Sequence, residues 1–460
     1  MRCLRVKARV LLKNNYNNMK HDRHRNLIYR LCIAPAVTAG KALCGIGYKW
    51  WLLAFLFVTF FLERCARQVY NATLPQIKAD FAVLGVTNTQ LGVVGSVFGA
   101  VFGMSLIGSG LAADFIGRKR TIVVGALLFS VGVLVSGFAH GLIVMVIFYG
   151  VINAIGQCCI APPSYSLISQ YHDNTTRSTA MSIFQSAVYA GMIISSVSAG
   201  KLASMGEGGW RHAFWILGGL GIAWTVVMHL FMRDTPQVPV RADDPDAKPS
   251  VRDGFLALLK KPTAILIALA FGMFVYASFG CRSWMILFMN EEFGETGLAS
   301  VSFHAVFWMC LGSLLGCLIT ARLVDKFGSG RPRIRLDVSV AGFLLMIGPM
   351  VWVGNARSLI ECCTALFVLG MTQGVYDAAH YPAMFDCIAP RYRSVTTGLT
   401  GCMAFLIGSL SPVVIGWMSE NMSMRVGLMS ISAFYLMGAI ILLPAQAVFF
   451  KKDWIGNEKA

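Results

Sequence analysis

Charged side chains are scarce in this sequence. They make up 13% of its 460 residues, whereas soluble globular proteins carry roughly 25%. A soluble chain of this length would divide into about two or three domains with polar surfaces, and this composition cannot supply such surfaces. The scarcity of charge therefore excludes an ordinary soluble protein.

The sequence also lacks the motifs of common enzymes and cofactor sites. It contains no Gly-Lys-Ser/Thr phosphate loop, no Gly-x-Ser-x-Gly motif and no His-Glu-x-x-His motif. Its 13 Cys residues show no Cys-x-x-Cys spacing, and free Cys within an apolar run behaves as a small apolar residue. We therefore predict that the chain is not an enzyme and holds no cofactor, no metal and no structural disulfide.

Long apolar runs are abundant instead, and hydrophobic residues make up 56% of the chain. Each run is long enough to cross a hydrocarbon layer of ~30 Å, where backbone groups must pair within a helix. The alternating strands of a membrane barrel are absent. The sequence thus predicts an all-α membrane protein of about twelve transmembrane helices in two pseudo-symmetric six-helix bundles. The predicted spans are residues 50–73, 88–112, 121–139, 141–169, 178–203, 211–232, 263–289, 298–321, 336–354, 358–386, 394–419 and 425–448.

The basic residues predict the orientation of these spans. With the N-terminus inside, Lys and Arg gather in the inner segments, which include Arg118 to Arg120 and the 233–262 linker, while the outer loops hold few. This bias places both termini in the cytoplasm, most simply of a plasma (inner) membrane. The net charge of +17 then reflects topology, and we predict no nucleic-acid partner.

Composition divides the chain into five segments. Residues 1–49 form a basic tail, in which Met19 is an alternative start to Met1, and residues 50–232 form the first six-helix half. Residues 233–262 are rich in Pro and mixed charge, as linkers are. Residues 263–449 form the second half, and residues 450–460 form the C-terminal tail. Because one chain carries both halves, we predict a monomer.

The two halves repeat a motif after their second span. Gly110, Asp114, Gly117, Arg118 and Lys119 resemble the G-x-x-x-D-R-x-G-R-[RK] signature of the major facilitator superfamily, with Phe115 in place of one Arg. A weaker copy follows the eighth span, in Asp325, Lys326 and Gly328. The resemblance implies a secondary transporter that alternates between two conformations, with both motif copies acting as a latch. The alternative is that these basic residues merely fix topology.

A finer resemblance lies in the first span. Arg67 stands eight residues before Pro75, which is similar to the anion:cation symporter and organophosphate antiporter families. The resemblance implies that Arg67 meets an anionic substrate. Two departures are clear: Ala66 and Gln157 occupy positions where the symporter branch carries acids. Phe279 replaces the antiporter branch's Arg of span seven, although Arg282 follows within one turn.

Ionisable side chains inside spans are functional candidates because they are costly there. Arg67 and Arg282 are predicted to contact an anion through their planar guanidinium groups. The alternative for Arg67 is an internal pair with Glu63 four residues earlier, and Arg64 is interpreted as a brace for a neighbouring helix. The other predicted substrate contacts are polar or aromatic residues that could equally serve helix packing: Tyr70, Gln157, Gln185, Tyr189, Gln373 and Tyr376.

Three side chains are predicted to couple transport to protons. Glu63 could release Arg67 when protonated, and Asp377 could pair with His380 three residues later. The alternative is a pair that only braces span ten. We predict transport of a small organic anion, such as a sugar acid or other carboxylate, coupled to protons. The alternatives are an organophosphate antiporter, an exporter of hydrophobic compounds, or a transporter-like solute sensor.

Overall fold

The computed structural model describes residues 47–172, 176–206, 208–233, 251–328 and 333–454. The predicted tails at 1–49 and 450–460 lie almost wholly or partly outside these ranges. Within them all regular structure is helical, and 11 helices are long and apolar enough to cross a membrane. Helix α4 (Tyr48–Phe81) is also long but carries Glu63, Arg64 and Arg67 in its apolar stretch. The prediction of about twelve spans is thereby confirmed. Residues Phe55–Ala460 form one compact unit, and the description below concerns this unit.

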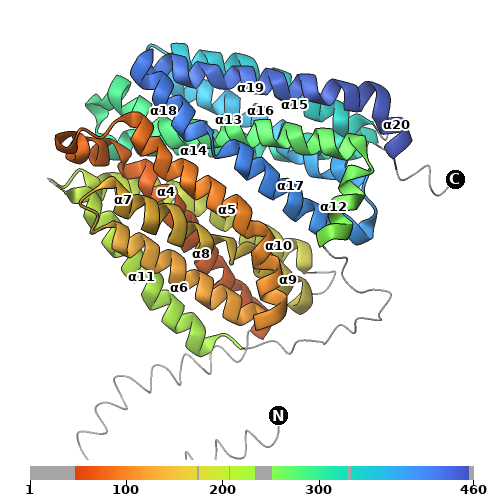
Figure 1. Ribbon diagram of the computed structural model, residues 1–460, viewed down its shortest axis with the longest axis horizontal. Helices are drawn as coiled ribbons and strands as arrows, with labels where there is room; N and C mark the ends of the chain where they lie inside the picture. Colours follow the sequence, from red (N-terminus) through yellow and green to blue (C-terminus); the bar gives the residue numbers. More distant parts are fainter. Residues whose placement is uncertain (1–46, 173–175, 207, 234–250, 329–332, 455–460) are drawn as a thin grey trace, which may run out of the picture. The chain divides into compact units, whose positions relative to one another are not determined.

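The helices before and after the linker gather in two groups (Figure 1). The first group comprises α4, α5 (Asn88–Ile116), α6 (Arg118–Ser136), α10 (Arg177–Ala203), α11 (Gly209–Phe231) and a fourth span built from α7 (Leu142–Met145), the π-helical segment Val146–Asn153, α8 (Ala154–Cys158) and α9 (Ala161–Tyr171). The second group comprises α13 (Pro262–Phe293), α14 (Leu298–Gly328), α15 (Ile334–Asn355), α16 (Leu359–Phe385), α17 (Arg393–Gly408), α18 (Ser411–Asn421) and α19 (Met424–Pro444) with the π-helical segment Ala445–Phe449 and α20 (Phe450–Asp453). The division into two six-helix domains remains a prediction.

The linker contains one helix that the sequence did not predict, α12 (Val251–Leu259). It packs against α17, where Gly254 comes close to Val395. Nearby, the backbone N–H of Thr263 at the start of α13 donates to the Asp453 carboxylate over 2.8 Å, which satisfies one of the donors that a helix N-terminus leaves free. We call this side of the molecule the linker end.

Glycine spacing sets the closest packing in the second group. Gly312 and Gly316 on α14 face Gly370 and Gly374 on α16, and a Cβ at any of the four would overlap backbone atoms of the opposite helix. Small residues four apart allow two membrane helices to approach closely. This contact fixes the depth and rotation of α16, which carries Asp377 one turn after Gly374.

The two groups meet mainly toward the end opposite the linker. Lys78 on α4 pairs with Glu291 on α13 at 2.7 Å. Glu420 on α18 accepts hydrogen bonds from the N–H of Thr89 on α5 at 2.6 Å and from its hydroxyl at 2.8 Å. Further along, Gly92 of α5 lies against the backbone of Pro412. In this conformation the opposite end is therefore closed by polar contacts between the groups.

Candidate functional site

Arg67 is the centre of a polar cluster on α4. Its Nη2 lies 3.2 Å from Glu63 Oε1, one helical turn earlier, so the internal pair that was the alternative to substrate contact is present in this conformation. Its Nε donates to Gln157 Oε1 at 2.9 Å, and Gln157 in turn donates to Asn153 Oδ1 at 2.9 Å. Glu63 is also 2.8 Å from the Nε of Arg64. A single carboxylate, with a relative exposure of 1%, therefore serves two guanidinium groups.

Aromatic rings hold Arg67 on its remaining faces. The guanidinium carbon lies 4.2 Å from the ring centre of Phe102 and 5.3 Å from that of Phe98, both on α5. Tyr149 donates its hydroxyl to the Arg67 carbonyl at 2.7 Å. Rings stabilise a desolvated cation through their π faces. These three aromatic residues and Asn153 were not predicted, because the apolar runs that contain them give no sequence signal for contact with a charge.

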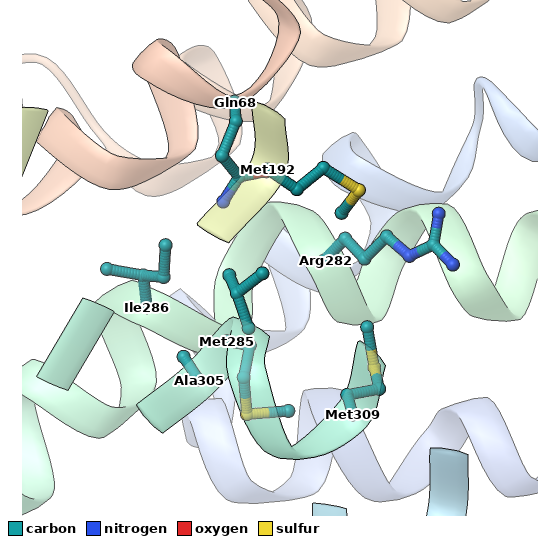
Figure 2. Close-up of a pocket in the computed structure, with 8 residues that line it drawn as sticks. Gln68, Met192, Arg282, Met285, Ile286, Ala305 and Met309 are labelled. Atoms are coloured by element: carbon teal, nitrogen blue, oxygen red, sulfur yellow. The ribbon is translucent and has the colours of Figure 1, made fainter. Parts of the chain in front are cut away.

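Arg282 on α13 is the second cationic candidate, and it is exposed in the middle of its helix. Within the described residues it forms no hydrogen bond and no ion pair. It lines a small cavity, with about 10 Å³ of free space, together with Gln68 of α4, Met192 of α10 and Met309 of α14 (Figure 2). That space holds about one water molecule. Both helix groups therefore contribute to the surroundings of Arg282.

Asp377 and His380 lie on the same helix but in different surroundings. Asp377 is half-buried and close enough to Arg282 to interact with its charge. His380 stacks on Tyr376 with ring centres 5.0 Å apart and on Phe271 at 4.8 Å. Both of its ring nitrogens are buried without a hydrogen-bond partner. The side chains of Asp377 and His380 form no hydrogen bond or ion pair among the described residues, and their proton-coupling role stays a prediction.

The remaining predicted contacts divide into buried and accessible residues. Tyr70 donates to the Leu91 carbonyl at 2.9 Å, and Gln373 donates to the Tyr435 hydroxyl at 3.3 Å. Tyr376 is buried as well, so these three side chains serve helix packing in this conformation. Gln185 is exposed and accepts a hydrogen bond from Tyr165 at 2.9 Å, and Tyr189 is half-buried.

The repeated motif is described only in part. Gly117 links α5 to α6 with φ of +96°, a backbone conformation in which Gly avoids steric cost. Arg118 and Lys119 then begin α6, where cations oppose the helix dipole. Arg118 and Lys119 therefore do not stabilise the start of this helix. Their role is either to fix the membrane topology or to pair with acidic side chains. Lys326 is exposed at the end of α14. Gly110 lies within α5 and Gly328 ends α14, and the side chains of Asp114 and Asp325 lie outside what the structure describes.

The comparisons with known proteins agree with this architecture. The family profile of the Major Facilitator Superfamily matches residues 56–412. The chain belongs to the major facilitator superfamily. It is thus a transporter-type membrane protein and not an enzyme.

Several curated relatives cover nearly the whole chain. One is the probable sulfoacetate transporter SauU of Cupriavidus necator, 24% identical over 87% of this chain and 93% of its own length. Another is the cis,cis-muconate transport protein of Acinetobacter baylyi, 22% identical over 88% of this chain and 96% of its own. The membrane sensor protein UhpC of Salmonella typhimurium is 23% identical over 84% of this chain and 88% of its own length.

Among solved structures, a bacterial homologue of the human lysosomal transporter Spinster has the same fold. That crystal structure is inward-facing and unoccupied, and it matches with a TM-score of 0.78 at 20% identity, over 89% of this chain and 99% of that one. At this identity the likeness establishes the fold alone, which confirms the predicted all-α transporter architecture.

Proposed function

We propose that this transporter moves a small organic anion across the membrane by alternating access, with the linker end facing the cytoplasm. The substrate is a sugar acid or another carboxylate. Arg67 and Arg282 bind its anionic groups, and a proton moves with it through Glu63 or Asp377. In the conformation described above, the opposite end is closed and the substrate exchanges at the linker end.

One observation carries this proposal: the charges in the middle of the spans do not cancel. Among the described residues they comprise three guanidinium groups and two carboxylates, those of Arg64, Arg67, Arg282, Glu63 and Asp377. The guanidinium groups therefore exceed the carboxylates by one. An ionisable group within a span is costly without a countercharge, and a bound anion supplies one for the excess guanidinium group.

The identity of Gln157 strengthens this argument. It stands where the symporter branch carries an acid, and in this chain its amide oxygen is the second partner of Arg67. A neutral amide binds a guanidinium more weakly than a carboxylate does. Arg67 thus has no second carboxylate partner in the described structure and is free to exchange the amide for a substrate carboxylate.

The names of three relatives support the same class of solute. Sulfoacetate, cis,cis-muconate and hexuronate, the last in a Bacillus subtilis transporter 21% identical to this chain, all carry a carboxylate. None of the three is a phosphate ester, and Phe279 replaces the Arg of the organophosphate branch. A carboxylate is therefore favoured over an organophosphate.

Anion-induced stabilisation of the purified protein tests the proposal. The panel comprises sulfoacetate, cis,cis-muconate, glucuronate, glycerol 3-phosphate and neutral glucose. A ligand at 100 times its Kd adds ~2.7 kcal/mol to the folded state. We expect a carboxylate to raise Tm in wild type and to lose this effect in Arg67→Ala. An equal response from the variant, or a response to glucose alone, would contradict the proposal.

A second candidate is a solute sensor, favoured by the similarity to UhpC. A sensor binds its anion without sustained flux, so the two functions separate in proteoliposomes. Binding with no uptake of the same anion supports the sensor, whereas concentrative uptake supports the transporter.

A further inference from the structure

Glu63 is shared between two arginines, and this sharing gives Arg64 a role. The Glu63 carboxylate contacts Arg64 Nε through Oε2 at 2.8 Å and Arg67 Nη2 through Oε1 at 3.2 Å. It is almost inaccessible to solvent, whereas the side chains of Arg64 and Arg67 keep relative exposures of 17% and 20%. The two arginine side chains are therefore partly exposed, whereas the carboxylate between them is not.

The geometry constrains what happens when Arg67 binds an anion. A substrate carboxylate that displaces the Gln157 amide also shares the Arg67 guanidinium with Glu63 and so weakens the pair between Arg67 and Glu63. If Arg67 were the only partner of Glu63, binding would leave a buried carboxylate unpaired, which is strongly unfavourable. Because Arg64 Nε lies 2.8 Å from the other carboxylate oxygen, as an ion pair outside hydrogen-bond geometry, Glu63 keeps a countercharge throughout.

The position of Arg64 is fixed well enough for this role. Its guanidinium carbon lies 4.6 Å from the ring centre of Phe60. Gly191 of α10 comes so close that a Cβ there would lie 2.8 Å from the Arg64 Cβ. The hydroxyl of Ser195 donates to the Cys65 carbonyl at 3.0 Å. This stretch of α4 is thus held against α10, and Arg64 stays beside Glu63 while Arg67 exchanges partners.

We infer that Arg64 is a positioning residue that retains Glu63 and so frees Arg67 for the substrate anion, without touching the substrate itself. This inference rests on the proposed function, in which Arg67 binds the anion. It assigns the affinity of the site to a group of three side chains rather than to Arg67 alone. It also explains why neighbouring residues, which normally diverge on a helix, are paired here.

Anion binding in a set of full-length variants separates this role from direct contact. The probe is whichever of sulfoacetate, cis,cis-muconate and glucuronate binds wild type most tightly. Arg64→Met removes the donor, and we expect it to weaken binding on the order of tenfold, because Glu63 then depends on Arg67 alone. Arg64→Lys, which keeps the charge, restores most of the affinity. In a Glu63→Gln background, Arg64→Met has little effect.

The outcomes distinguish this inference from the proposed function. An equal loss from Arg64→Met with and without Glu63→Gln means that Arg64 binds the anion directly, and it overturns the inference while the proposed function stands. An unchanged affinity in Arg64→Met overturns it too. If Arg67→Ala keeps wild-type affinity, or if no anion of the panel binds wild type, the proposed function fails and the inference fails with it.

A ligand-free measurement checks the sharing itself. Arg64→Met and Arg67→Met each leave Glu63 one partner, so each lowers Tm modestly. The double variant leaves the carboxylate with neither guanidinium, and we expect its Tm loss to exceed the sum of the two single losses. Adding Glu63→Gln recovers the excess. Strictly additive losses would overturn the inference.

Discussion

Arg67 Nε donates to the side-chain oxygen of Gln157 at 2.9 Å, joining α4 to α8 at the centre of the first helix group. The bond satisfies a buried cation with a neutral partner. This makes Gln157 a direct control on how strongly Arg67 is held. Whether residue 157 is neutral or acidic also decides how much of the positive charge of Arg67 is left to bind a solute.

Replacing the Gln157 amide with a carboxylic acid should weaken the binding of a substrate anion to Arg67. In Gln157→Glu, the introduced carboxylate pairs with Arg67 and competes with the substrate. We expect anion affinity at neutral pH to fall by about tenfold or more, and to recover as acid protonates the new group. Gln157→Met is the control, since it removes the hydrogen bond without adding charge. Tm shifts with the anion across pH provide the measurement, and unchanged affinity in the acid variant would contradict the account.

Proton coupling through span ten is predicted to involve Asp377 and not His380. Asp377 lies near the charge of Arg282, whereas the His380 ring stacks on Tyr376 and Phe271 and is buried. Asp377→Asn should therefore abolish the rise of anion uptake in an inward proton gradient, and His380→Phe should retain it. Uptake in proteoliposomes at external pH from about 5 to 8 measures both. A proton response lost in His380→Phe and kept in Asp377→Asn would reverse the assignment.

The contact between α14 and α16 is predicted to tolerate no added side chain. In Gly374→Leu the new atoms meet the backbone of α14 around Ser313 and Cys317. Overpacking costs about 1–3 kcal/mol, and more where backbone cannot move. Gly348→Leu on α15 is the matched control, because nothing lies within 4 Å of its Cβ position. Thermal unfolding in detergent should show a clearly lower Tm for Gly374→Leu and little change in Tm for Gly348→Leu.

The polar contacts at the opposite end are predicted to hold that end closed. Exposed pairs contribute about 0.2–1 kcal/mol each, so Glu291→Ala with Glu420→Ala should favour the open form by up to about thirtyfold. Spin labels at the exposed positions Val83 and Met422 should then move apart. Glu292→Ala, which breaks a pair with Arg425 within the second group, should leave the distance unchanged. An unaltered distance in the double variant would contradict the prediction that these contacts hold the end closed.

The sequence predicted the spans because apolar length decides them. It missed α12, since this short helix lies in a linker of charge and Pro and is stabilised by contact with α17. The pair of Glu63 and Arg67 followed from helical spacing alone. Helical spacing shows that the side chains of Asp377 and His380 can meet on one face of the helix. It does not show that Tyr376 and Phe271 stack on the imidazole.

The same limit applies to the residues around the cluster. Arg64 was interpreted as a brace, and the structure also pairs it with Glu63, which contacts Arg67. The hydrogen bond from Arg67 to Gln157 joins residues 90 positions apart, and sequence distance of this kind has no periodic signal. Such contacts depend on how helices pack, which the apolar pattern of each helix leaves open.

Uptake of a carboxylate by purified protein in proteoliposomes tests whether the protein transports an anion that Arg67 binds. Labelled cis,cis-muconate, sulfoacetate and glucuronate are offered to wild type, to Arg67→Gln and to Arg322→Gln, an exposed position on α14. The account predicts uptake of at least one anion by wild type and Arg322→Gln, with loss in a folded Arg67→Gln protein. Uptake by Arg67→Gln equal to that of wild type would contradict it.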